Sequence, residues 1–250
     1  MPTPPGTAGT AHHLNWTRGE TTVTTPYYRD DHVTLYLGDC REISEWRTAD
    51  VLVCDPPYGR GWRQGRLSAH HHADDSHRGI IGDLDTSTRD TALAQWGHRP
   101  ALVFGDLMLA PPHGTRLVAV YRKPPDAGFR GATGGIRRDA EGIYLVGSWP
   151  SGLGGRSSIF TTATRTIGGC SGPAGRTRHP HAKPGDVMET LITLCPPGAI
   201  ADPFAGSGTT LIAARSLGRH AIGVEIEEKY CELIARRLDQ HALPIRGIKR

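Results

Sequence analysis

The sequence lacks the features that mark membrane, secreted and disulfide-stabilised proteins. No apolar run approaches the roughly 20 residues that a membrane span needs, and the N-terminus has no charged-then-apolar secretion pattern. The cysteines number five, with no C-x-x-C pair to suggest zinc or a redox couple. We therefore expect reduced, structural thiols in a soluble, cytoplasmic protein.

The sequence also lacks a large net charge: the formal net charge is only +4 at pH 7. The excess is concentrated between Arg122 and Arg178, where nine Lys or Arg residues face three acids. A basic segment of this kind permits contact with nucleic acid without requiring it.

Short apolar runs alternate with helical patterns along most of the chain. Strands are predicted at residues 33–37, 50–54, 101–104, 117–121, 143–146, 199–201 and 221–225. Helices are predicted from Asp186, from the end of a glycine-rich turn to Leu217, and around Tyr230 to Leu238. This alternation predicts an α/β fold with a doubly wound, mostly parallel sheet covered on both faces.

The length of 250 residues suits one main α/β domain with a small insert. Residues 1–28 read as a flexible tail, and residues 244–250 as a second one. The main domain is expected at 29–123 and 179–243, and the glycine-dense stretch 124–178 is the insert. A long loop is predicted from Gly59 to about Asp83.

A glycine-rich turn, Asp202 to Thr210, lies between a predicted strand and a predicted helix. Its glycines let backbone N–H groups approach a ligand at the helix N-terminus, as in a cofactor-binding turn. Glu225 ends the next strand, where a carboxylate can accept hydrogen bonds from ribose hydroxyls.

The sequence Asp55-Pro56-Pro57-Tyr58 directly follows an apolar strand. Two prolines cannot donate to a sheet ladder, so the chain leaves the sheet there with free carbonyls. If the Asp55 carboxylate and the Pro56 carbonyl accept the hydrogens of an exocyclic amine, the nitrogen lone pair becomes available to an electrophilic methyl. Tyr58 can then stack on a base swung out of a duplex.

These two motifs, DPPY and DPFAGSGTT, resemble those of the amino-methylating DNA methyltransferases. Because DPPY comes first, the chain is similar to the permuted class called beta. The resemblance covers roughly residues 28–243. Further matches in the expected order are Gly38-Asp39, the stretch HPHAKP at 179–184, and Gly223-Val224-Glu225.

The resemblance implies a Rossmann-like, S-adenosylmethionine-dependent methyltransferase fold with permuted motif order. It implies that the target base is held by the catalytic residues Asp55, Pro56, Pro57 and Tyr58. For the cofactor, it implies Asp39 at the adenine, Glu225 at the ribose, and Lys183 and Pro184 beside the methionine end. The cofactor turn comprises Asp202, Phe204, Ala205, Gly206, Ser207, Gly208 and Thr209.

The resemblance also implies partners. The insert 124–178 stands where the class keeps its target recognition region, so double-stranded DNA is the expected substrate. A homodimer and a cognate restriction endonuclease are further partners that the resemblance allows. In place of a Trp-containing strand end, this chain has Tyr121-Arg122-Lys123.

Several alternatives stay open at this point. Adenine N6 is the favoured target, and cytosine N4 is the alternative because some N4 enzymes also carry DPPY. A non-catalytic DNA-binding relative would need a damaged cofactor turn or a lost carboxylate, but Asp55 and Glu225 are both present. A nicotinamide-dependent dehydrogenase offers no role for DPPY. Consecutive histidines at 70–72 seldom converge on one ion, so no metal site is predicted.

Overall fold

The computed structural model describes residues 24–61, 79–125, 127, 132–152, 154–162 and 182–242. Its strands are β1 (Tyr28–Arg29), β2 (Val33–Leu37), β3 (Val51–Cys54), β4 (Ala101–Gly105), β5 (Thr115–Arg122), β6 (Ala140–Val146), β7 (Ile159–Thr161), β8 (Ile200–Asp202) and β9 (Ala221–Glu225). Its helices are the 3-10 helix η1 (Glu45–Thr48) and the α-helices α1 (Ser87–Trp96), α2 (Gly185–Leu194), α3 (Thr209–Ser216) and α4 (Glu228–Ala242).

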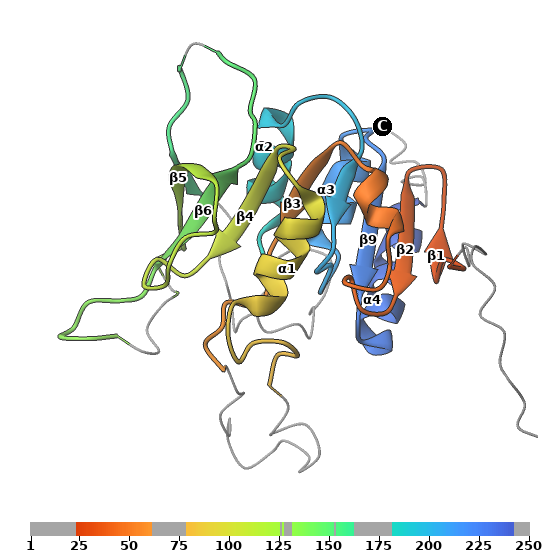
Figure 1. Cartoon of the computed structure of the whole chain (residues 1–250), viewed down its shortest axis with the longest axis horizontal. Coiled ribbons are helices and arrows are strands. Elements are labelled where there is room, and N and C mark those ends of the chain that lie inside the picture. The colour runs from red at the N-terminus through yellow and green to blue at the C-terminus, as the bar shows by residue number, and fades with distance from the viewer. Residues whose placement is uncertain are drawn as a thin grey trace, which may run out of the picture.

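All the described strands join one sheet in the order β1-β2-β9-β8-β3-β4-β6-β5-β7. Five consecutive strands, β2, β9, β8, β3 and β4, run parallel to one another. The antiparallel pairs are β1 with β2, β4 with β6, and β5 with β6. Five of the eight strand pairs in this order are therefore parallel, and the predicted mostly parallel sheet is confirmed (Figure 1).

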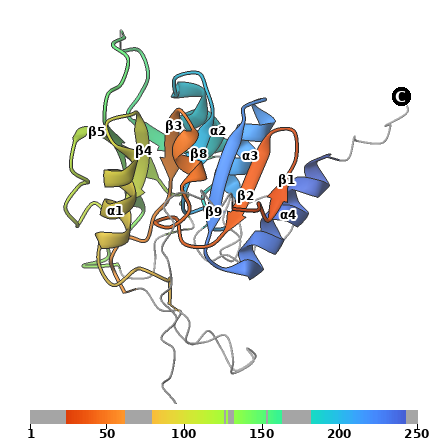
Figure 2. The same cartoon turned by 45° about the vertical axis from the view of Figure 1, so that its right-hand side comes forward.

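Helices cover both faces of the sheet, as predicted for a doubly wound fold. One core cluster packs α2, α3 and α4 against the sheet, through side chains such as Leu191, Leu211 and Ile234. A second cluster on the opposite face packs η1 and α1 through Trp46 and Trp96. Figures 1 and 2 show α1 on one side of the sheet and the pair α2 and α3 on the other.

The predicted insert supplies strands of the central sheet. Within residues 124–178, β6 lies between β4 and β5, and β7 pairs with β5 at the sheet edge. The β5–β6 register places Tyr121 opposite Glu141. The segment assigned to recognition therefore brings at least one acidic side chain into the main domain.

Two other differences concern the ends of predicted segments. Residues 24–28, assigned to the tail, contact the fold: the Thr24 N–H donates to Glu45, and Tyr28 begins β1. Helix α1 was missed because only Arg89, Ala92 and Trp96 of its residues are buried, which leaves a weak apolar pattern. Among the described residues, no helix has the length and hydropathy of a membrane span.

Candidate active site

Four acidic residues gather at the carboxyl ends of four neighbouring parallel strands. Asp39 follows β2, Glu225 ends β9, Asp202 ends β8, and Asp55 follows β3. Parallel strands end at the same edge of a sheet, which is the usual ligand-binding edge of open α/β sheets. The two predicted motifs therefore leave adjacent strands, β3 and β8, at one edge.

The glycine-rich turn after β8 is tied to the end of β9. The Ala205 N–H donates to the Val224 carbonyl at 3.0 Å, and the Gly206 N–H donates to Glu225 Oε2 at 2.7 Å. Gly208, at the N-terminus of α3, has a φ of 77°, a left-handed conformation that glycine adopts without strain. The turn thus has a defined shape in which backbone N–H groups face the sheet edge.

The acids at the ends of β8 and β9 are buried. Burial raises the pKa of Asp202 to about 7, and the carboxylates of Asp55 and Glu225 act in the same direction. Burial likewise raises the pKa of Glu225 to about 7, although the N–H groups of Glu227 and Gly206 favour its ionised form. A cation or hydroxyl donors at this edge would stabilise both carboxylates.

Other predicted cofactor residues lie around the same turn. The Phe204 N–H donates to Asp202 Oδ1 at 3.1 Å, and the hydroxyls of Ser207 and Thr209 are 3.1 Å apart. Asp39 is bound by Arg41, whose guanidinium holds the pKa of that carboxyl below its usual range.

The DPPY motif forms a compact polar cluster. Asp55 Oδ1 accepts a hydrogen bond from the Tyr58 hydroxyl at 2.8 Å, and Asp55 Oδ2 accepts one from Lys183 Nζ at 2.6 Å. Lys183 also donates to the Tyr58 hydroxyl at 3.1 Å. Pro56 is buried and Pro57 is half-buried. Asp55 and Tyr58, two of the four catalytic residues predicted from the motif, are therefore in contact with a lysine from another part of the chain.

Lys183 has contacts that the resemblance did not imply. It was predicted beside the methionine end of the cofactor, and in the structure its ammonium pairs with Asp55 and lies 4.9 Å from the centre of the Phe104 ring. Pro184, the next residue, is the N-cap residue of α2. The cofactor contact of both residues stays a prediction.

Glu141 and Lys123 belong to this cluster, and sequence analysis missed both roles. Glu141 Oε2 lies 3.2 Å from Lys183 Nζ, and Glu141 Oε1 lies 2.6 Å from Lys123 Nζ. Burial favours the neutral acid, but these two ammonium groups hold the pKa of Glu141 at about 2. An acid in the otherwise apolar strand β6 was the signal that could have identified it.

The chain after Tyr58 is held by Asp83. The carboxylate of this buried acid accepts hydrogen bonds from the N–H groups of Gly59 at 2.7 Å and Arg60 at 3.3 Å. Asp83 therefore fixes the exit of the DPPY segment from the sheet. The predicted loop lies largely outside the described residues, which leave out 62–78.

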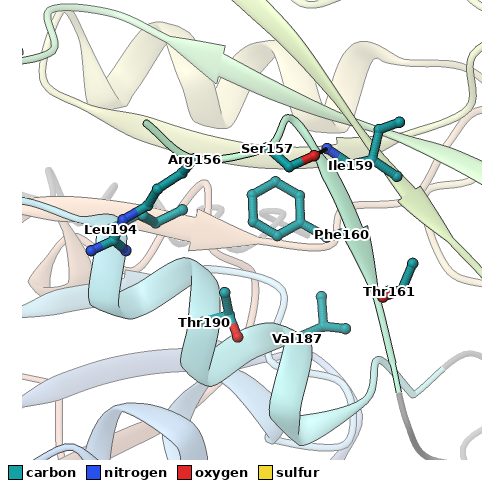
Figure 3. Close-up of a pocket in the computed structure, with 8 residues that line it drawn as sticks. All are labelled: Arg156, Ser157, Ile159, Phe160, Thr161, Val187, Thr190 and Leu194. Atoms are coloured by element: carbon teal, nitrogen blue, oxygen red, sulfur yellow. Dashed lines mark hydrogen bonds between the residues drawn. The ribbon is translucent and has the colours of Figure 1, made fainter. Parts of the chain in front are cut away.

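A pocket of about 240 Å³ lies away from this cluster, between β7 and α2 (Figure 3). Phe160 extends over Val187 and Thr190 of α2, and Arg156 lies at one end. None of the predicted site residues lines this pocket. In the described part of the chain, no group of three or more His, Cys, Asp or Glu side chains could hold a metal ion. The histidine cluster at 70–77 falls outside that part.

Comparison with known proteins points to one family. Residues 139–236 match the N6_N4_Mtase family, described as DNA methylase. M.ScaI, a type II methyltransferase of Streptomyces caespitosus, is 46% identical over 69 residues, which are 27% of this chain and 23% of M.ScaI. These matches support the resemblance to the amino-methylating DNA methyltransferases that the motifs predicted.

The relatives differ in how much of this chain they match. YubD of Escherichia coli (strain K12) is 27% identical over 222 residues, which cover 80% of this chain and 88% of YubD. By contrast, the chain spans about a quarter of the length of M.ScaI and of the other first curated relatives that it matches.

Solved structures share the fold at low sequence identity. The cytosine-N4-specific PvuII DNA methyltransferase has a TM-score of 0.59 and 15% identity, over 89% of this chain and 90% of that one. M1.HpyAVI, solved as a complex with SAM, has a TM-score of 0.53 and 19% identity, over 82% of this chain and 99% of that one. The Rossmann-like methyltransferase fold predicted from the motifs is thereby confirmed.

Proposed function

We propose that this protein transfers a methyl group from S-adenosylmethionine to the exocyclic amine of a base in duplex DNA, with adenine N6 as the favoured target. The observation that carries the proposal is the adjacency of β3 and β8. One strand ends in the Asp55–Tyr58 cluster and the other ends in the glycine-rich turn. Chemistry on a base amine needs a methyl donor and an amine acceptor at one place, and this sheet edge supplies both kinds of side chain.

The residues at the turn suit S-adenosylmethionine. The Glu225 carboxylate accepts backbone N–H groups, Gly206 at Oε2 and Glu227 at Oε1, and its four lone-pair sites leave room for a ribose hydroxyl. Asp202, buried with a raised pKa, is favoured in its ionised form by a nearby sulfonium cation. When bound, the cofactor supplies an electrophilic methyl group. The residues assigned to hold it are Asp39, Pro184, Asp202, Phe204, Ala205, Gly206, Ser207, Gly208, Thr209 and Glu225, with Lys183 at the border of the two sites.

The Asp55 cluster suits an amine. The Asp55 carboxylate and the Pro56 carbonyl accept the two amine hydrogens, which withdraws the nitrogen lone pair from the ring and frees it for attack. The ring of Tyr58 stacks on the base, which has to leave the duplex to reach the site. Pro57 fixes the backbone between these groups.

Basic side chains from the segment 124–178 are assigned to DNA. The described part of the structure includes Arg137, Arg138 and Arg156 of this segment. Arg138 pairs with Asp106, which follows the carboxyl end of β4. Phosphate contacts from such arginines depend strongly on salt. Binding to duplex DNA is therefore expected to weaken steeply between low and moderate ionic strength.

The test is a transfer assay with methyl-labelled S-adenosylmethionine. The protein is incubated with duplex DNA of mixed sequence, the DNA is digested to nucleosides, and the labelled nucleoside is identified. Label on N6-methyladenine supports the proposal, and label on N4-methylcytosine supports the alternative target. Label on neither base would refute the proposed activity. Mapping modified positions in genomic DNA of cells that express the protein then identifies the target sequence.

A further inference from the structure

Both oxygens of the Asp55 carboxylate already have partners. Lys183 Nζ lies 2.6 Å from Oδ2, and the Tyr58 hydroxyl lies 2.8 Å from Oδ1. Under the proposed function, a hydrogen of the target amine is accepted by this same carboxylate. Each oxygen can accept a second hydrogen bond, but an amine that binds there shares Asp55 with an ammonium, which is the stronger competitor. The amine is therefore bound best when Lys183 moves away from Oδ2.

Lys183 cannot simply move into an uncharged environment. Only 7% of its side chain is exposed, and a buried ammonium without a counter-ion costs several kcal/mol. Burial lowers the pKa of Lys183, but the carboxylates of Asp55 and Glu141 raise it above its ordinary value, so the group stays charged.

Glu141 is positioned to receive that ammonium. Its Oε2 is 3.2 Å from Lys183 Nζ and 3.4 Å from the Tyr58 hydroxyl. Its Oε1 is held by Lys123 at 2.6 Å, which fixes the carboxylate from the far side. Lys183 therefore keeps a counter-ion when it shifts toward Glu141. The Asp55 carboxylate then keeps the hydrogen bond from the Tyr58 hydroxyl and gains one from the amine.

We infer that Glu141 is a positioning residue of the amine site: it holds the Lys183 ammonium while the target amine takes the place of that ammonium on Asp55. This inference rests on the proposed function and extends it. Glu141 touches neither the base nor the cofactor in this arrangement. It acts through Lys183, on the availability of the Asp55 carboxylate.

The first test compares Glu141→Gln with the wild-type protein. Without the second carboxylate, Lys183 binds Asp55 more tightly and competes with the amine. We expect the dissociation constant for the target duplex to rise about tenfold, as for the loss of a hydrogen bond to a charged group. Binding of a duplex whose target base lacks the amine, purine for adenine or pyrimidinone for cytosine, should be unchanged. An equal loss of affinity for both duplexes would indicate a general defect in packing and would overturn the inference.

Two further variants keep this test decisive. Glu141→Asp retains the negative charge and should recover most of the lost affinity and transfer rate. Glu232→Gln removes an exposed acid of α4 that pairs with Arg236, and should match the wild type in every measurement. The affinity for S-adenosylmethionine serves as the check that each variant is folded.

A second measurement needs neither DNA nor cofactor. A small acylating reagent is applied to the folded protein, and labelling of Lys183 is quantified by mass spectrometry. In Asp55→Asn, Glu141 should keep Lys183 charged and as unreactive as in the wild type. The double variant Asp55→Asn/Glu141→Gln should label about tenfold faster, because the buried amine then loses its charge. Rapid labelling in Asp55→Asn alone would show that Glu141 cannot hold the ammonium.

The outcomes separate the two proposals. If the wild-type protein labels neither adenine nor cytosine, the proposed function fails. If it transfers methyl groups but Glu141→Gln binds and methylates the target duplex as well as the wild type does, the function stands and the role of Glu141 is refuted.

Discussion

The carboxylate of Glu225 accepts the backbone N–H of Gly206 at 2.7 Å, which connects the end of β9 to the glycine-rich turn after β8. The same acid that is assigned to the ribose therefore also shapes the turn assigned to the methionine part of the cofactor. Because this carboxylate is buried, its ionisation costs free energy in the folded protein, and the stability of the fold therefore depends on pH.

This cost predicts how stability varies with pH. Burial raises the pKa of Glu225 from an ordinary 4.5 to about 7, so between these values the folded protein holds a proton that the unfolded chain has lost. The stabilising contribution is complete below about pH 4.5 and is lost as pH rises through 7, about 3 kcal/mol in all. Asp202 acts in the same direction.

The measurement is urea unfolding at pH 5 and pH 8 of the wild-type protein and of Glu225→Gln. The variant cannot titrate at this position, so it should lose less free energy of unfolding between the two pH values than the wild type does. Parallel changes in the two proteins would mean that Glu225 ionises normally. Glu141 does not change the free energy of unfolding between these pH values. Its pKa of about 2 places its effect on stability below pH 4.5.

Gly208 should be irreplaceable for a steric reason. Its φ is +77°, and an added Cβ would lie 2.7 Å from Ile234 Cγ1 on α4. Gly208→Ala should cost about 1 kcal/mol for the left-handed backbone and about 1–3 kcal/mol for overpacking. It should also weaken S-adenosylmethionine binding, because the turn must shift.

Gly218 is the matched control for Gly208. Its φ is +69°, but nothing lies within 4 Å of an added Cβ. Gly218→Ala should therefore cost only the backbone contribution of about 1 kcal/mol and leave cofactor binding unchanged. Urea midpoints and cofactor titrations of the two variants provide the comparison, and equal destabilisation would exclude the contact with Ile234 as the cause.

Local patterns were sufficient to predict most of the sheet and its binding edge. The predicted strands at residues 33–37 and 221–225 coincide with β2 and β9, because apolar runs bounded by glycine and acidic residues define their own ends. The two motifs were predicted at strand ends for the same reason. Helix α1 and strand β7 lack such patterns, since α1 buries an arginine and β7 is mostly exposed.

The contacts of Lys183 could not be predicted in this way. The resemblance placed it beside the methionine end of the cofactor, but no local pattern indicated its ion pairs with Asp55 and Glu141. Its partner Glu141 lies on β6, whose place between β4 and β5 is a matter of tertiary pairing. An acid in an apolar strand marks Glu141 as unusual, but which side chains it meets through the sheet order leaves no local signal in the sequence.

Asp83 should be required for the shape of the DPPY exit. In Asp83→Ala the N–H groups of Gly59 and Arg60 lose their acceptor, which should cost about 1–3 kcal/mol. The variant should be less stable and should transfer methyl groups more slowly than the wild type. Its affinity for the cofactor should be unchanged, because the glycine-rich turn follows another strand. Asp85→Ala is the control, since this exposed acid accepts hydrogen bonds from the backbone and side chain of Ser87 and none from Gly59 or Arg60. Thermal unfolding and transfer rates are measured for both variants, and equal effects would contradict the assignment.

Asp55→Ala provides the sharpest separation between cofactor binding and chemistry. The substitution removes the acceptor of the target amine, so transfer should fall by at least about a hundredfold. Lys183 keeps Glu141 as an ion-pair partner, and the turn with Glu225 is untouched, so the affinity for S-adenosylmethionine should change little.

The control for Asp55 is the acid after the neighbouring strand. Asp106 follows β4 at the same edge of the sheet but pairs with Arg60 and Arg138. Asp106→Ala should retain transfer within a few-fold, because neither partner belongs to the Asp55 cluster. Single-turnover transfer and cofactor titration of both variants are the measurements. Wild-type activity in Asp55→Ala would remove the carboxylate from the mechanism, and equal losses in both variants would mean that any acid at this edge matters only for the fold.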